Sequence, residues 1–204
     1  MITYNGAMIL DSADGRVLYR QELKADDARL ILEAGLNYDT TMCIWSDNKL
    51  YGNKLNDRIQ EYSQATKVTP FLMPSIDQLL ARGITKILWY DDISKIQQIE
   101  KKLRETALFH NVTFCTSKPF YLEFFSSKVS KATAIDRIGE IYGFTQAETI
   151  AIGDGFNDLS MIRHAALGAA MGNAPDGVKE CADYITTRTN NQDGVAEVLE
   201  KFIL

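Results

Sequence analysis

Two aspartates and an asparagine follow a short apolar run in the second half of the chain. Residues 149–153 read Thr-Ile-Ala-Ile-Gly, and Asp154, Asn157 and Asp158 come directly after them. A carboxylate at the carboxyl end of a buried strand can bind a hard cation, and the backbone N–H groups of a following helix favour an anion. A carboxylate for the cation next to N–H groups for the anion is typical of a magnesium-assisted phosphoryl-transfer site. Turn and helix-capping roles would explain any single residue equally well, but they explain the whole cluster poorly.

Lys131 is the second candidate, because it lies in the first turn of the helix expected over residues 130–143. A cation at a helix N-terminus opposes the helix dipole, so a nearby phosphate or carboxylate cluster would have to compensate it. A solvated surface lysine is the alternative. Since the unit that carries Lys131 directly precedes the unit that carries Asp154, we weigh the two interpretations equally. His110 and His164 are expected to be structural.

The elements that must position these residues change in character near Phe120. After it, short apolar runs alternate with helices, which predicts a parallel sheet of the doubly wound type that starts with a strand over residues 121–125. Before it, strands arrive in pairs, with hairpin turns expected at residues 14–15 and 47–48, which is typical of an α+β unit. Residues 1–10 are expected to form one strand with a glycine interruption.

Composition narrows the classes of function. The chain has 204 residues, 46% of them hydrophobic, which suits one large or two small domains, and its net charge of −5 argues against nucleic acid as a partner. The three cysteines form no CxxC pair, so we expect neither disulfides nor a cysteine metal site. No apolar run approaches about 18 residues, and we expect a cytoplasmic protein without a membrane partner.

Five stretches resemble the Cof-type branch of the haloacid dehalogenase-like (HAD) hydrolases. They read ITYNGAMI, LEFFSSKVSKATAI, IAIGDGFNDLSMI, AAMGNAPDGVKECADYIT and NNQDGVAEVLEKF, and they run from residue 2 to residue 202. The resemblance implies an α/β fold with a partial Rossmann-like core, residues 1–9 and 119–204, and an α+β cap domain over residues 10–118. It also implies Mg²⁺-dependent hydrolysis of small phosphorylated metabolites, such as sugar phosphates, through an aspartyl-phosphate.

The same resemblance assigns roles to the candidate residues. Asp154 would bind Mg²⁺, Lys131 would contact the nucleophile and the phosphate, and Asn157 would contact the phosphate. Asp158 would support the loop of residues 153–158, called the acidic loop below. Family members carry the nucleophile in a D-x-D-x-[TV] sequence, followed later by a phosphate-binding Thr or Ser. No aspartate of this chain is followed two residues later by another.

We therefore expect the chain alone to be inactive, with Mg²⁺ binding weakened or lost because the partner carboxylates are missing. Two hypotheses stay open. A longer chain or a partner could supply the nucleophile segment, or the protein could be a truncated, non-catalytic remnant that binds a ligand or a partner. Since the missing strand would leave open edges in the core sheet, we also expect a homo-oligomer.

Overall fold

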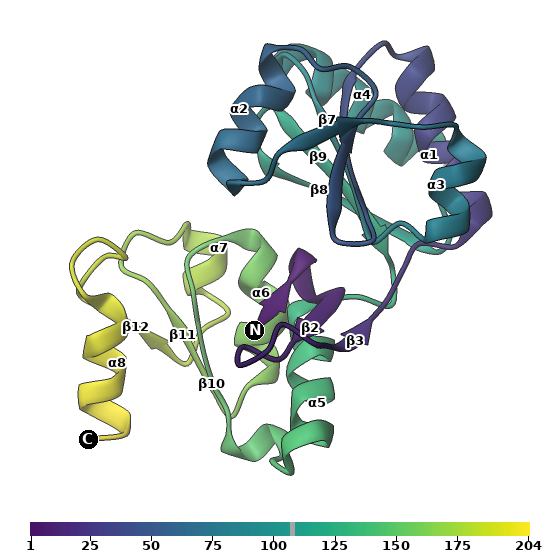
Figure 1. Ribbon diagram of the computed structural model, residues 1–204. Coiled ribbons are helices and arrows are strands. Elements are labelled where there is room, and N and C mark those ends of the chain that lie inside the picture. The colour runs from purple at the N-terminus through teal and green to yellow at the C-terminus, as the bar shows by residue number, and fades with distance from the viewer. Residues whose placement is uncertain (107–108) are drawn as a thin grey trace. The chain divides into compact units, whose positions relative to one another are not determined.

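The computed structural model describes residues 1–106 and 109–204, and these form two units (Figure 1). The discontinuous unit comprises Met1–Tyr19 and Val129–Leu204, and the inserted unit comprises Arg20–Lys128. The sequence places the boundaries at residues 9/10 and 118/119 instead. The second boundary differs because β9 (Tyr121–Ser126) pairs with strands of the inserted unit and not with the parallel sheet. The first differs because the residues up to Tyr19 belong with the N-terminal strands.

The N-terminal residues form a hairpin and not the single expected strand. β1 (Ile2–Thr3) pairs antiparallel with β2 (Met8–Leu10), and β3 (Val17–Arg20) is the third strand of this small sheet. The chain reverses through the short 3₁₀ turn η1 (Tyr4–Gly6), whose three residues have φ values of 52°, 57° and 106°. Left-handed backbone at three consecutive residues ends the first strand and starts the second.

The rest of the discontinuous unit has the alternating pattern that the sequence predicts. β10 (Ile150–Gly153), β11 (Leu167–Ala170) and β12 (Tyr184–Ile185) form a parallel sheet in that order. Its helices are α5 (Lys131–Tyr142), α6 (Leu159–His164), α7 (Asp176–Lys179) and α8 (Gly194–Phe202). Ile162 of α6 and Val178 of α7 pack with Ala170 over one sheet face. The α/β class is thus confirmed.

Over its described residues, 20–106 and 109–128, the inserted unit contains a mixed six-stranded sheet and four helices (Figure 1). Its strand order is β6 (Pro70–Leu72), β5 (Lys49–Gly52), β4 (Thr41–Ser46), β7 (Lys86–Tyr90), β9 and β8 (Val112–Lys118). The helices are α1 (Ala25–Asn37), α2 (Asp57–Thr66), α3 (Ile76–Arg82) and α4 (Ile93–Thr106). The hairpin predicted around residues 47–48 joins β4 to β5.

Strand alternation distributes the side chains of this sheet between two faces. Trp89 and Phe124 belong to the buried cluster that also contains residues of α1, α3 and α4. On the other face Trp45 donates its indole N–H to the hydroxyl of Tyr62 in α2, at 3.0 Å. The sheet also buries an ion pair between Lys86 and Glu123, with 2.7 Å between Nζ and Oε2.

The three cysteines carry free thiols, and Cys43 is buried so completely that desolvation raises its pKa to about 12. Over the described residues, no helix combines the length and the apolar character needed to cross a membrane.

Candidate functional site

The carboxylate of Asp158 connects the turn in which it lies to the end of β10 and to the start of α5. It lies in the turn η3 (Phe156–Asp158) after β10, and its side chain is only 7% exposed. Oδ2 accepts the backbone N–H groups of Asp154 and Gly155, each at 3.0 Å, while Oδ1 accepts the ammonium of Lys131. A methyl group on Gly153 would lie 2.7 Å from Asp158 Cγ, so glycine at the strand end lets the carboxylate approach the backbone.

Lys131 reaches Asp158 because of the way α5 begins. Ser130 is the N-cap, and its hydroxyl accepts the N–H of Thr133 while its own N–H donates to the Thr133 hydroxyl, both at 3.0 Å. This reciprocal capping fixes the first turn, where Lys131 is the first helical residue. The sequence expects an anion that compensates this cation, and the structure places the Asp158 carboxylate there.

Asp154 is held by a loop that sequence reasoning missed. Its Oδ2 accepts the side-chain N–H of Asn190 at 2.7 Å, and the backbone N–H of Asn190 donates to Asn173 Oδ1 at 2.8 Å. Loops after β10, β11 and β12 therefore meet at the carboxyl ends of the strands, where ligands of parallel sheets bind. The sequence could have predicted a place for Asn190 near the site, because Asn190 follows the last strand of the alternating pattern.

Asn157 is exposed within η3. A methyl group on Gly155 would lie 2.7 Å from Asn157 Oδ1, so the amide folds back along its own turn. The structure thus brings Lys131, Asp158 and the Asp154 backbone into direct contact, and it leaves Asn157 beside them on the surface.

The residues present do not form a complete Mg²⁺ site. Mg²⁺ prefers an octahedral shell of oxygen ligands, of which the protein usually supplies one or two carboxylates. Asp154 offers one carboxylate, whose Oδ2 is already bonded to Asn190, and Asp158 is occupied by Lys131 and two N–H groups. No group of three or more His, Cys, Asp or Glu side chains is placed to bind a metal ion within residues 1–106 and 109–204.

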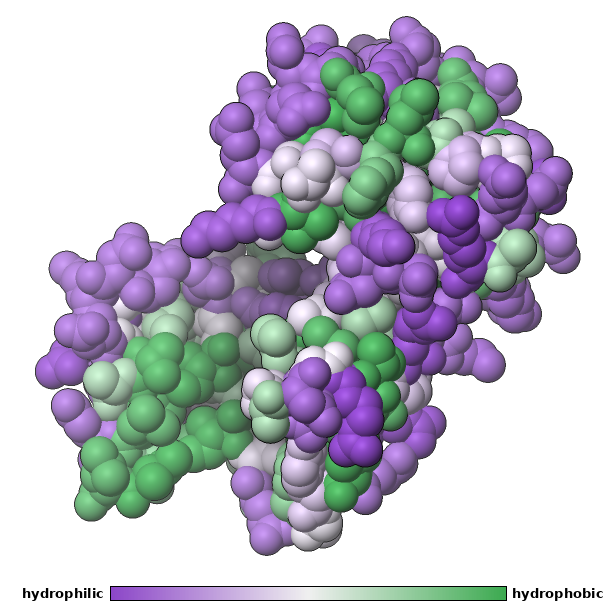
Figure 2. Space-filling view, in the orientation of Figure 1, coloured by the Kyte–Doolittle hydropathy of each residue, from purple (hydrophilic) through white to green (hydrophobic). Residues whose placement is uncertain are grey.

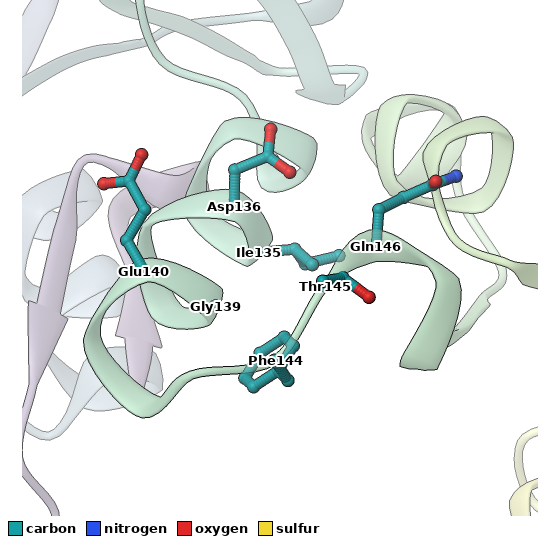
Figure 3. Close-up of a pocket in the computed structure, with 7 residues that line it drawn as sticks. All are labelled: Ile135, Asp136, Gly139, Glu140, Phe144, Thr145 and Gln146. Carbon is teal, nitrogen blue, oxygen red and sulfur yellow. The ribbon is translucent and has the colours of Figure 1, made fainter.

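Two cavities of the discontinuous unit flank α5. One, of about 360 Å³, is lined by Lys131, Ile135, Met161 and residues 2–6 of the N-terminal hairpin. The other, of about 420 Å³, lies further along α5 (Figure 3). Figure 3 shows that its carboxylates, Asp136 and Glu140, point in different directions and do not converge on a common point. Lys131 lines the first cavity, and none of the predicted site residues lines the second.

Comparison with known proteins gives a consistent result. The family model described as haloacid dehalogenase-like hydrolase matches residues 1–199. The Bacillus subtilis protein YxeH is 31% identical over 210 residues, which cover 100% of this chain and 76% of YxeH. The 5-amino-6-(5-phospho-D-ribitylamino)uracil phosphatase YcsE of the same organism is 30% identical, over 100% of this chain and 72% of YcsE.

Solved structures of similar sequence also share the fold of this chain. A haloacid dehalogenase-like hydrolase from Bacteroides thetaiotaomicron superposes with a TM-score of 0.83 and 31% identity, over 97% of this chain and 74% of its own. A Thermotoga maritima protein gives a TM-score of 0.82 and 30% identity, over 98% and 74%. The chain therefore spans about three quarters of the length of each of these proteins.

Proposed function

This chain belongs to the haloacid dehalogenase-like hydrolase family, and we propose that it carries part of the active site of a phosphatase for small phosphorylated metabolites. The observation that supports this most directly is the contact of Lys131 with Asp158, whose carboxylate also binds the backbone of the Asp154 loop. The relative YcsE is named for a substrate with a phosphorylated ribityl chain. A phosphate monoester on a sugar-like chain is therefore the substrate class we propose, in the cytoplasm, where free thiols persist.

Each residue has a defined task in this proposal. The Lys131 ammonium and the Asn157 amide would donate hydrogen bonds to phosphate oxygens and stabilise their charge. Asp158 would orient Lys131 and hold the Asp154 loop in place. Asp154 would supply one carboxylate toward Mg²⁺, which when bound stabilises the charge on phosphate oxygens.

The covalent step requires a carboxylate that these residues do not provide. In phosphoryl transfer to an aspartate, the carboxylate is the nucleophile, and it must lie in line with the leaving oxygen. Since no D-x-D sequence is present, we propose that this aspartate comes from a segment beyond these 204 residues, in a longer chain or in a partner. The 204-residue chain by itself is then inactive.

Hydrolysis of p-nitrophenyl phosphate tests the proposal. We expect no Mg²⁺-dependent turnover by the chain alone, and turnover when it is co-expressed with the D-x-D-bearing strand–helix segment of a relative. That activity should disappear in Lys131→Ala and Asp154→Ala but persist in Asp136→Ala, a control on the exposed part of α5. Turnover by the chain alone that Asp154→Ala abolishes would overturn the proposed inactivity.

A binding protein without catalysis is the second candidate, and the missing nucleophile favours it. Such a protein would bind inorganic phosphate, measured by ³¹P NMR titration, with an affinity that Lys131→Met reduces. It would also stay inactive when the D-x-D segment is supplied. The co-expression experiment therefore separates the two candidates.

For the 204-residue chain by itself, without the D-x-D segment, we also propose that a second copy of the chain covers the open edge of β10. Thr149 and Gly153 accept hydrogen bonds from the β11 side, so the backbone groups of Ile150 and Ile152 face away from β11. The strand has no charge, proline or bulge to protect this edge. Two β10 strands that run antiparallel about a two-fold axis would pair Ile150 of each with Ile152 of the other.

Hydrophobic surface is also exposed on the opposite side of this sheet, at the edge strand β12 and on α8. Figure 2 shows a hydrophobic region over α8 and the neighbouring strands. Its exposed residues include Ile185, Val195, Leu199 and Phe202. We expect a dimer in sedimentation velocity at micromolar concentration and a monomer for Ile152→Lys, and a monomeric wild type would refute the proposal.

A further inference from the structure

The geometry points to a positioning role for Gly6, in the Asn-Gly-Ala sequence that the proposed function leaves unused. We propose that the left-handed turn Tyr4–Gly6 fixes Lys131 by packing Gly6 against the first turn of α5. The proposal rests on the function proposed above for Lys131.

Gly6 touches the start of α5 so closely that no side chain fits. Its φ is +106°, and a methyl group there would overlap the carbonyl oxygen of Ser130 and lie 2.9 Å from the carbonyl carbon. The same methyl would lie 3.2 Å from Cβ of Ala134, one helical turn further along. Both the backbone conformation and the close approach therefore require glycine.

The group that Gly6 touches is the first acceptor of the helix. The Ser130 carbonyl accepts the N–H of Ala134 at 3.1 Å and the Thr133 hydroxyl at 3.0 Å. A side chain at position 6 would push this carbonyl away and disturb the turn in which Lys131 follows directly. The position of the N-terminal hairpin therefore affects the position of Lys131 through the peptide group that joins Ser130 to Lys131.

The contacts continue from Lys131 to the acidic loop. Its ammonium bonds to Asp158, and Asp158 in turn accepts the N–H of Asp154. Gly6, Ser130, Lys131 and Asp158 thus form one continuous series of contacts. The turn also lines the 360 Å³ cavity next to Lys131, so a change there alters the surroundings of the ammonium directly.

Acylation of lysine amines with an N-hydroxysuccinimide ester, read by peptide mass spectrometry, tests this role without using activity. The labelling rate of Lys131 is divided by that of Lys179, a lysine of α7 in the same unit. We expect Gly6→Ala to raise this ratio about three- to five-fold, the change that loss of a partly exposed ion pair would give. Asp158→Ala should raise it by a similar factor.

Gly143→Ala is the matched control, because Gly143 ends the same helix with a φ of +80° and a methyl group there would meet no atom within 4 Å. It carries the same kind of backbone penalty without the overlap, so its ratio should stay within a factor of about two. An unchanged ratio in Gly6→Ala, or an equal rise in Gly143→Ala, would overturn the proposal.

Two further measurements keep the outcomes distinct. If Gly6→Ala does not fold, Asn5→Ala disturbs the same turn more mildly, since alanine tolerates the φ of 57° less well than asparagine, and it must raise the ratio. Hydrolysis of p-nitrophenyl phosphate by the wild type co-expressed with the D-x-D segment is measured separately. A wild type that stays inactive there refutes the proposed phosphatase function, while a raised Lys131 ratio in Gly6→Ala still supports the positioning role.

Discussion

Replacement of Asp158 by alanine should destabilise the discontinuous unit and leave the inserted unit unchanged. The carboxylate accepts three hydrogen bonds, two from the backbone N–H groups of Asp154 and Gly155 and one from Lys131. Alanine removes all three acceptors at once. The two N–H groups then point into the space that the carboxylate filled, next to the end of β10.

The magnitude follows from these contacts. An unsatisfied N–H group costs about 1–3 kcal/mol, and we take about 1 kcal/mol for each because Asp154 and Gly155 are half-buried. The Lys131 ion pair is partly exposed and adds up to about 1 kcal/mol. The expected loss is roughly 3 kcal/mol of unfolding free energy, or about 3 M in urea midpoint at a slope near 1 kcal/mol/M.

The two tryptophans make the assay specific for each unit. Trp45 and Trp89 both belong to the inserted unit, so indole fluorescence reports its unfolding, while far-UV circular dichroism reports helices of both units. In Asp158→Ala the discontinuous unit should unfold at a lower urea concentration, and this appears as a loss of ellipticity before the fluorescence changes. The urea midpoint of the fluorescence change should stay the same. Asp136→Ala, which removes an exposed carboxylate bonded to His164, should cost less than about 1 kcal/mol. Equal effects of the two substitutions, or a shift in the fluorescence midpoint, would refute the reasoning.

Three other predictions concern stability. Lys86→Met leaves Glu123 buried without its cation and should cost about 3 kcal/mol in fluorescence-monitored unfolding, whereas adding Glu123→Leu should recover most of that loss. Asn56→Ala removes the N-cap of α2 and should cost about 1 kcal/mol in the same assay. Hydrogen bonds, first of all from the Thr187 N–H, lower the pKa of Glu197 to about 2, against about 4.3 in an unfolded chain. Its stabilisation is therefore complete above about pH 4.3 and lost as the pH falls toward 2, and Glu197→Gln should flatten this acid-side loss in ellipticity-monitored unfolding.

Local patterns predicted much of the parallel sheet and its acidic loop. Alternation of apolar runs and helices over residues 149–202 depends on short-range signals, and these placed β10, β11 and β12 correctly. The sequence left the role of Lys131 even between two interpretations, and it based proximity to the Asp154 loop on a strand–helix unit whose strand, β9, belongs to the other sheet. The chemical roles of these residues stay predictions.

The features that the sequence did not predict depend mostly on contacts between residues distant in sequence. The run Tyr121–Ser126 is equally compatible with a parallel or an antiparallel sheet, and only its pairing with β7 and β8 decides. Asn5-Gly6 is a typical hairpin signal, and its interpretation as a simple interruption of one strand was wrong. The bond between Asn190 and Asp154 joins loops 36 residues apart, and periodicity carries no information about such contacts.

The insertion of one unit within the other sets an order of events during synthesis. The ribosome completes Arg20–Lys128 before any of the residues from Val129 onward, so the inserted unit has all of its strands while the N-terminal hairpin still lacks its helix. Gly6 meets Ser130 only after the intervening unit has emerged. Assembly of the Lys131 site is therefore a late step in the maturation of the nascent chain, because one side of this contact is synthesised after the whole inserted unit.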